Sequence, residues 1–291
     1  MLEPFTVIIP AHNEEAVIAR CLQAARSGAP VGAQIEIIVA ANGCTDDTVE
    51  VAREADGDAI VLDLAQCSKT RAINAANAAA SHFPRIYLDA DVVCGYASLA
   101  ALAEALREPG VMVAAPGIRH DFSDANWVVR AYYGAWSKQP YARSGRGGAG
   151  CYGLSRAALE RIGSFPEIIG DDIWIHTRFA EDERRFVTRT GDGQPVFSLV
   201  RPPDTGLDQV RVEARRMFGN AEVRRLYPSP HVTQLAKGGG FAGAIRSDAS
   251  ALEVIVFTII KGLVRLDMIR RKWLGAQKVW VRDTSSRQRS A

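Results

Sequence analysis

The sequence predicts an α/β fold in which a mostly parallel central sheet carries helices on both faces. Two observations lead to this prediction. Short runs rich in β-branched residues alternate four times with helix-like segments before residue 95. The spacing between successive runs is short, so each helix-like segment connects two neighbouring runs. Such alternation is typical of strand–helix–strand units, whose strands run parallel and are buried on both faces.

The elements of this first half can be assigned in order. The strands are continuous apolar runs, as buried parallel strands usually are. They are expected over Phe5–Ile9, Ile35–Val39, Ala59–Leu62 and Arg85–Leu88. The helices between them are expected through Ala16–Leu22, capped by His12 or Asn13, from Thr45 onward, and over Ser68–Ser81.

The second half is less regular and is divided by its glycines. Ser144–Gly153 contains five glycines and is either a surface loop or a substrate-gating loop. A short helix is expected over Ala157–Ile162 and a long basic helix over Val210–Leu226, before a hinge at Gly238–Gly240. Residues 1–230 should therefore form one domain with halves 1–95 and 96–230, and residues 231–291 a helical extension with a basic tail.

The composition argues against several classes of protein. The chain has 291 residues, of which 47% are hydrophobic, enough for an ordinary core. A net charge of +2 argues against a nucleic-acid partner. The five cysteines show no metal-binding spacing and suit a reducing compartment. No signal peptide and no uncharged apolar stretch of about 18 residues is evident, so a cytoplasmic location is expected.

Asp89 and Asp91 form the most informative pair in the chain. They directly follow the expected strand Arg85–Leu88. Residues two apart in a strand point to the same face, so a strand ending in this pair would hold two carboxylates side by side. Mg²⁺ favours such oxygen ligands and keeps positions open for substrate phosphates. On its own the pattern is more often a solvated loop.

The surrounding segments favour the metal site. In parallel sheets of this kind, ligands bind outside the carboxyl ends of the strands. Pro10–Glu14, Ala41–Cys44 and Asp89–Asp91 all follow expected strands, so they should meet in one crevice.

Several segments, taken together and in order, resemble glycosyltransferase family 2. The resemblance extends over roughly residues 5–225, and it is the order of the segments that makes it specific. The segments are Val7–Glu15, Ile38–Thr48, Lys69–Asn74, Tyr87–Asp91, Gly150–Arg156 and Asp171–Arg178.

The resemblance implies a GT-A fold and a nucleoside-diphosphate sugar as donor. Pro10, Ala11 and Glu14 would line the nucleoside pocket, where Glu14 would accept a hydrogen bond from base or ribose, unless it only stabilises a helix start. Asn42 stands where the family often has Asp. An amide can accept from uracil N3–H and donate to O4, which favours UDP, unless Asn42-Gly43 is only a turn.

The resemblance also implies where the diphosphate and its cation would bind. Lys69 or Arg71 would neutralise the diphosphate, although either could instead be an exposed basic residue. Asp91 would be the direct ligand of Mg²⁺ or Mn²⁺, and Asp89 would hold ribose or a metal-bound water. The cation would stabilise charge on the departing nucleoside diphosphate.

The acidic pair Asp171-Asp172 resembles the family's catalytic pair. Asp172 would then be the general base that takes a proton from an acceptor hydroxyl, and in-line attack would invert the anomeric configuration. Asp171 would mainly cap a helix. Met217 follows Arg216 where processive synthases have Trp, so a processive polymerase is not expected. His231 is either a surface residue or a further metal ligand.

Two other functions and two roles for the C-terminal helix stay open at this point. A sugar nucleotidyltransferase would have a glycine-rich opening, which Pro10–Glu14 lacks, and a non-catalytic nucleotide-sugar-binding or assembly protein would not need Asp89, Asp91 and Asp172. The acceptor could be a carbohydrate, a lipid-linked sugar or a small molecule. The helix over Ala249–Leu274 either packs on the domain or makes peripheral contact with the inner face of the membrane.

Overall fold

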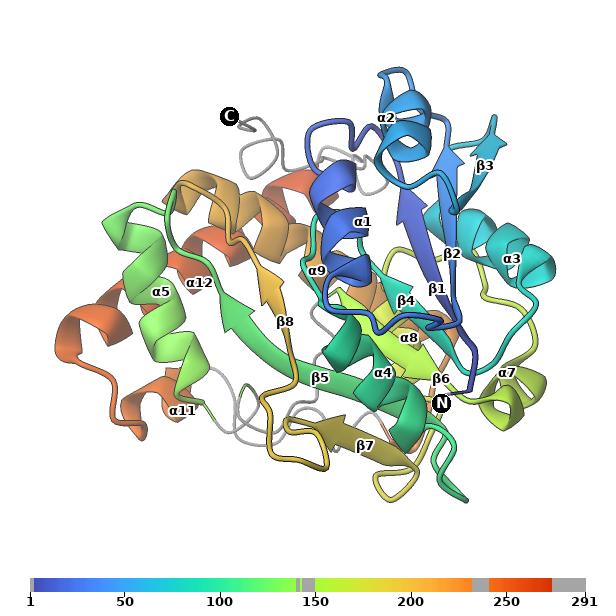
Figure 1. Ribbon diagram of the computed structural model, residues 1–291. Helices are drawn as coiled ribbons and strands as arrows, with labels where there is room; N and C mark the ends of the chain where they lie inside the picture. The colour runs from blue at the N-terminus through green and yellow to red at the C-terminus, as the bar shows by residue number, and fades with distance from the viewer. Residues whose placement is uncertain (1–2, 140–141, 143–149, 232–240, 274–291) are drawn as a thin grey trace.

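The computed structural model describes residues 3–139, 142, 150–231 and 241–273. At its centre is an eight-stranded sheet in the order β3-β2-β1-β4-β6-β5-β7, with β8 paired to β5 (Figure 1). β6 runs antiparallel to β4 and β5, and the other strand pairs are parallel. The strands are β1 (Phe5–Ala11), β2 (Ile35–Asn42), β3 (Ile60–Leu64), β4 (Arg85–Leu88), β5 (Val113–His120), β6 (Cys151–Leu154), β7 (Arg184–Val187) and β8 (Phe197–Val200). The predicted mostly parallel α/β fold is confirmed.

Helices cover both faces of this sheet, as predicted. They are α1 (Ile18–Arg26), α2 (Thr48–Ala55), α3 (Lys69–Ala79), α4 (Tyr96–Ala105), α5 (Trp127–Ser137), α7 (Arg156–Ile162), α8 (Asp171–His176), α9 (Gly206–Leu226), α11 (Phe241–Ile245) and α12 (Ala251–Trp273). The sequence pattern did not predict β5, β7, β8, α4, α5 or α11. The hinge at Gly238–Gly240, the tail at Ser285–Ala291 and residues 144–149 of the glycine-rich segment lie outside the described residues.

Two predicted helix starts are wrong, for one shared reason. Asn13 does not cap α1, which begins at Ile18 without a side-chain cap. Asn13 instead takes a φ of 53°, and its Oδ1 accepts a hydrogen bond from the backbone N–H of Thr45 at 2.7 Å. This bond ties the β1–α1 loop to the β2–α2 loop, so Thr45 belongs to the loop and α2 begins at Thr48. The two loops are thereby fixed at the edge where ligands are expected to bind.

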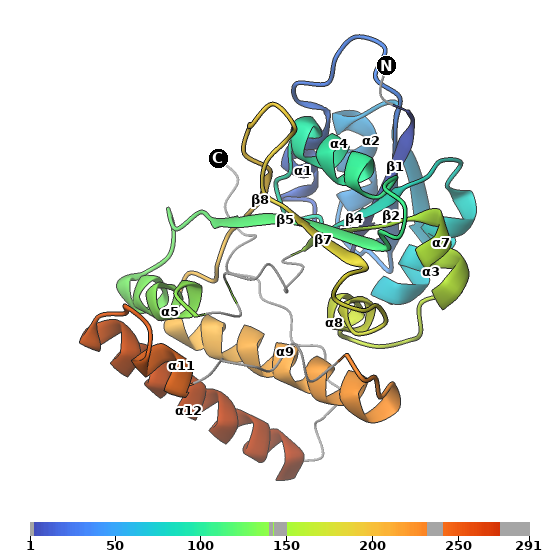
Figure 2. The ribbon, with the colours of Figure 1, turned by 90° about the horizontal axis from the view of Figure 1, so that it is seen from below.

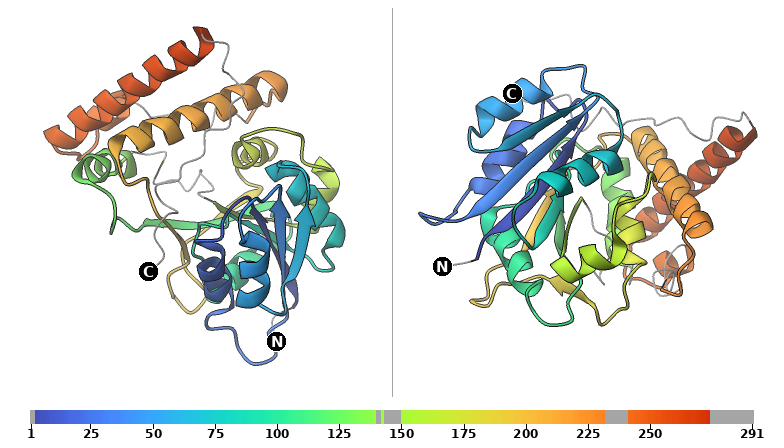
Figure 3. Two further views of the ribbon diagram at one scale, coloured as in Figure 1. Left: turned by 90° about the horizontal axis from the view of Figure 1, so that it is seen from above. Right: turned by 90° about the vertical axis from the view of Figure 1, so that its right-hand side faces the viewer.

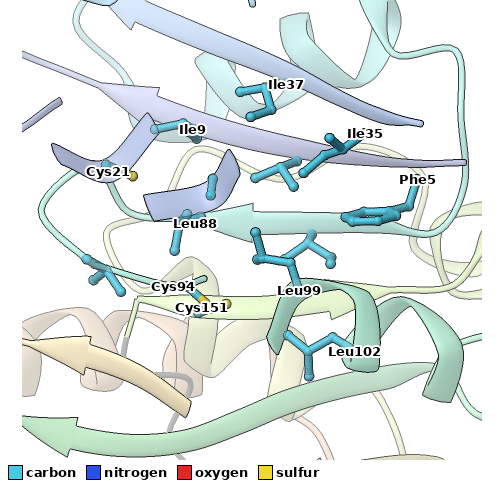
Figure 4. Close-up of a cluster of buried hydrophobic side chains, with 14 of the residues drawn as sticks. Phe5, Ile9, Cys21, Ile35, Ile37, Leu88, Cys94, Leu99, Leu102 and Cys151 are labelled. Carbon is cyan, nitrogen blue, oxygen red and sulfur yellow. The ribbon is translucent and has the colours of Figure 1, made fainter. Parts of the chain in front are cut away.

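The two faces of the sheet carry separate apolar clusters. Strand side chains such as Ile9, Ile37 and Leu88 pack with α1 and α4 on one face, as Figure 4 shows. On the other face, residues such as Ile8 and Ile38 pack with α3, α7 and α8. Successive residues of β1 and β2 alternate between these clusters, as expected for central parallel strands.

A third layer of helices lies beside the sheet. Figures 2 and 3 show α9 and α12 running side by side, with α12 on the outside and α5 and α11 near one end. Their shared core contains Tyr132, Ala214, Phe257 and Ile260. The C-terminal helix therefore packs on the domain along one side. Among the described residues, no helix is long and apolar enough to cross a membrane.

Candidate active site

A cavity of about 750 Å³ lies at the carboxyl ends of β1, β2 and β4. Its opposite wall is formed by α8, α9 and α5, which supply residues such as Asp172, Arg216 and Trp136. Most of the predicted site residues line this one cavity. Those that do are Pro10, Glu14, Asn42, Lys69, Asp89, Asp91 and Asp172.

Ala11 and Arg71 are the two predicted site residues that do not line it. The side chain of Ala11 is buried in the sheet cluster, and its carbonyl oxygen accepts a hydrogen bond from Asn42. Arg71 points out of the first turn of α3 and pairs with Glu167 and Gln66. About half of its side chain is exposed, which fits the alternative considered for Arg71, an exposed basic residue. A helix places residues i and i+2 on different sides, which separates Arg71 from Lys69.

The amide of Asn42 is committed to the protein itself. Its Nδ2 donates to the carbonyl oxygens of Ala11 at 2.7 Å and Ala40 at 3.2 Å. Its Oδ1 accepts from the backbone N–H of Ser68 at 3.1 Å, and the residue is 2% exposed. Both N–H donors of the amide are therefore used within the protein, and in this arrangement neither is available for the predicted donation to uracil O4. Asn42 instead joins the ends of β1 and β2 to the start of α3.

Lys69 lies at the centre of the site's charges. Its ammonium is 2.8 Å from Oδ1 of Asp89 and 3.0 Å from Oδ1 of Asp171. Burial acts to lower the pKa of Lys69, but the carboxylates of Asp171 and Asp89 outweigh it and raise that pKa. Lys69 is therefore charged at neutral pH and joins the segment after β4 to the start of α8.

Asp171 is the buried member of the acidic pair. Its side chain is only 4% exposed, and Tyr152 of β6 donates to its Oδ2 at 3.0 Å. The predicted helix cap is wrong for Asp171, because α8 has no side-chain cap at its N-cap position and this carboxylate is held by Lys69 and Tyr152. Asp171 therefore anchors α8 to the sheet.

Asp172 faces the cavity and has the environment of a base. Its Oδ1 accepts from the backbone N–H of Ile173 at 2.7 Å. Burial raises the pKa of Asp172, although Lys69 and the Ile173 N–H oppose this. A carboxylate with a raised pKa is a better proton acceptor, which is the property a general base needs.

Asp89 and Asp91 lie in a turn directly after β4, whose predicted bounds are confirmed, so the same-face rule for strand residues does not apply to the pair. The N–H of Asp89 donates to the carbonyl oxygen of Gly150 at 2.8 Å, and the Asp89 carbonyl oxygen accepts from Val92 at 3.0 Å. A Cβ atom on Gly150 would lie 3.1 Å from Oδ2 of Asp89 and 2.5 Å from Cγ2 of Val92. Gly150, at a φ of +70°, therefore lets the chain pass against the aspartate turn.

These groups suit a cation that is coordinated partly by the protein and partly by the phosphates of a bound nucleotide. Carboxylate oxygens are the donors that Mg²⁺ and Mn²⁺ prefer. One oxygen of Asp89 is engaged by Lys69, which makes Asp89 less suitable as a direct ligand of the metal. Among the described residues, no cluster of three or more His, Cys, Asp or Glu could hold a metal ion. His231, considered above as a further ligand, does not line the cavity and lies near Glu183 instead.

A cluster of aromatic side chains that was not predicted from the sequence also lines the cavity. His120 of β5 lies 4.6 Å from the ring of Tyr133 and 5.7 Å from the ring of Trp136, both on α5. Burial lowers the pKa of His120 to about 4, so it is neutral at pH 7. The aromatic-rich stretch of α5 was visible in the sequence, but only the fold brings it to the cavity.

The chain also resembles known proteins in sequence and in fold. Residues 6–160, just over half of the chain, match the sequence model described as Glycosyl transferase family 2. A search of curated proteins found no match.

The fold is also found in solved structures. A mannosyltransferase from Pyrobaculum calidifontis, in complex with GDP-Man and Mn²⁺, has a TM-score of 0.60 at 21% identity, over 94% of this chain and 83% of its own. Glucosyl-3-phosphoglycerate synthase from Mycobacterium tuberculosis, in complex with Mn²⁺, UDP-Glc and glycerol 3-phosphate, has a TM-score of 0.54 at 22% identity, over 78% and 81%. At these identities the likeness shows the fold.

Proposed function

The chain belongs to glycosyl transferase family 2, and we propose on this premise that it moves a sugar from a nucleoside-diphosphate sugar to an acceptor hydroxyl with inversion. The observation that supports this most is the meeting of Asp91, Lys69 and Asp172 in one cavity from three distant segments. Residues 1–230 would carry the activity, with residues 231–291 as an extension.

The donor would lie across the carboxyl ends of the strands. Pro10, Glu14 and the backbone around Asn42 would border the nucleoside, and Asp89 and Asp91 the diphosphate. A bound Mg²⁺ or Mn²⁺ would be held by Asp91 and would stabilise negative charge on the diphosphate. The Mn²⁺ complexes of both solved neighbours support this choice of cation.

Asp172 would accept the proton of the acceptor hydroxyl. Lys69 would keep Asp171 and Asp89 in place, so that the base and the donor face each other across the cavity. A single carboxylate base with direct attack at the anomeric carbon gives inversion, because no covalent sugar–enzyme intermediate is formed.

Removal of the metal ion and replacement of Asp91 test this reaction. We expect the purified chain with Mn²⁺ to release the nucleoside diphosphate from a UDP- or GDP-sugar, and EDTA to stop the release. Asp91→Ala should abolish metal-dependent binding of the diphosphate, whereas Asp58→Ala, an exposed aspartate outside the cavity, should not. A chain that binds nucleotide sugars but never breaks them would instead be a binding protein.

The nucleobase is the finer part of the proposal. Both N–H groups of Asn42 bind backbone carbonyl oxygens, so donation to uracil O4 does not support UDP in this structure. One solved neighbour is in complex with GDP-Man and the other with UDP-Glc. We retain UDP as the proposed nucleotide on the other half of the Asn42 prediction, since its Oδ1 accepts one hydrogen bond, from Ser68, and has a second lone pair for uracil N3–H. Competition between UDP and GDP for the metal-loaded chain decides it, since tighter binding of GDP would reject UDP.

A further inference from the structure

The outward face of α12 carries an apolar stripe that the proposed reaction does not use. Seven large apolar side chains on this helix are between 40% and 86% exposed. They are Leu252, Ile255, Ile259, Leu263, Leu266, Ile269 and Trp273. Their spacing of three or four residues places them along one side of a helix about 35 Å long.

This stripe is additional to the face by which α12 packs on the protein. Val256, Phe257, Ile260 and Val264 are buried against α5 and α9. The core therefore accounts for one apolar face of α12 and leaves a second one exposed, and Figure 2 shows that α12 is the outermost helix of its layer. Exposed apolar surfaces of this extent usually mark an interaction site.

The charges around the stripe are positive. Arg265 and Arg270 are exposed on α12, and no ion pair is formed by either within the described part of the chain. The two acidic residues of the helix are turned to other partners, since Glu253 pairs with Lys138 and Asp267 with Arg271. The sequence that follows, residues 274–291, contains four Lys or Arg and one Asp.

We propose that the outward face of α12 lies on an anionic lipid surface, with the apolar stripe in the interface and the arginines at the headgroups. An interfacial helix combines these features, and a tryptophan at its end, here Trp273, is typical of the headgroup region. A second copy of the chain fits the charges less well. A symmetric contact would place the same face on both sides, and that face has no carboxylate to pair with Arg265 or Arg270.

Vesicle binding by the full chain tests this proposal. We expect it to co-float with vesicles of phosphatidylcholine containing about one-third phosphatidylglycerol, and much less with phosphatidylcholine alone. Ile259→Gln/Leu266→Gln should weaken binding at least about tenfold, because both side chains would leave the lipid. Val31→Gln replaces a fully exposed residue between α1 and β2 and should leave binding unchanged.

Charge variants and a salt titration separate electrostatic attraction to anionic lipid from non-specific apolar adsorption. Arg265→Gln/Arg270→Gln should reduce the preference for the anionic vesicles, and raising the salt concentration should do the same in the unmodified chain. All these side chains are exposed, so the variants should keep the melting temperature and donor hydrolysis of the unmodified chain, which keeps this test separate from that of the reaction.

Three results would overturn the proposal. The first is no binding to the anionic vesicles. The second is unchanged binding by Ile259→Gln/Leu266→Gln, which would assign it to the basic sequence after α12. The third is a dimer in light scattering that becomes a monomer in this variant, which would show that the stripe joins two copies of the chain.

Discussion

Replacing Lys69 by methionine should separate what this residue does for stability from what it does for donor binding. Its ammonium lies 3.0 Å from a carboxylate oxygen of Asp171, whose side chain is 4% exposed. At an effective dielectric constant of about 20, two unit charges at this distance attract by roughly 5 kcal/mol. Desolvation offsets part of this, and breaking a buried pair typically costs about 3–5 kcal/mol.

The expected loss for Lys69→Met is therefore about 3 kcal/mol, because Lys69 is 28% exposed and Tyr152 still donates to Asp171. In a chain of 291 residues, that lowers the melting temperature by roughly 5 °C. Urea unfolding followed by circular dichroism measures the loss. Calorimetry with UDP and Mn²⁺ should show weaker binding as well, because Asp89 has lost the cation that holds it.

The double variant Lys69→Met/Asp171→Asn is the matched control. It removes the uncompensated buried carboxylate, so it should regain most of the stability while binding of the nucleotide stays weak. Unchanged urea unfolding of Lys69→Met would refute the assigned charge network. Recovery of nucleotide binding in the double variant would show that Lys69 acts only through Asp171.

Three further predictions concern the carboxylates. Asp172→Asn should lower turnover by about 10²–10⁴-fold with nucleotide affinity nearly unchanged, as measured by sugar transfer or donor hydrolysis; near-normal turnover would place the base elsewhere. Because burial raises the pKa of Asp172, the acid limb of the kcat/KM profile should lie above the pH expected for an ordinary aspartate, and an ordinary limb would contradict the assignment. Glu213 is buried, which opposes its ionisation, but Arg216 and Lys261 lower its pKa to about 2. Its contribution to stability is therefore complete above about pH 4.5 and lost as the pH falls towards 2, a loss that Glu213→Gln should abolish in acid unfolding curves.

The apolar pattern of the first ninety residues was sufficient to predict the central sheet. Of the four strands there, β1, β2 and β4 are local apolar runs that are buried as their composition predicts, and the bounds of β4 were predicted at Arg85–Leu88, whereas β3 lies at the edge of the sheet and is partly exposed. The position of the site followed as well. Strands that run parallel bring their carboxyl ends to one edge, so the residues after β1, β2 and β4 had to meet there.

The tertiary structure alone decided how each polar group is used. Asn42 could read a base or hold the backbone, and only the positions of Ala11, Ala40 and Ser68 settle that its amide holds the backbone. Tyr152 was not predicted as the partner of Asp171. It lies on β6, and only the antiparallel pairing of β6 with β4 brings it to Asp171. Hydrogen bonds and ion pairs depend on a few tenths of an ångström between residues distant in the sequence, whereas burial depends on averages over neighbouring residues. For this reason the sequence determined the sheet and its binding edge, and the packing of α8, α9 and α5 against that edge determined the chemistry of the site.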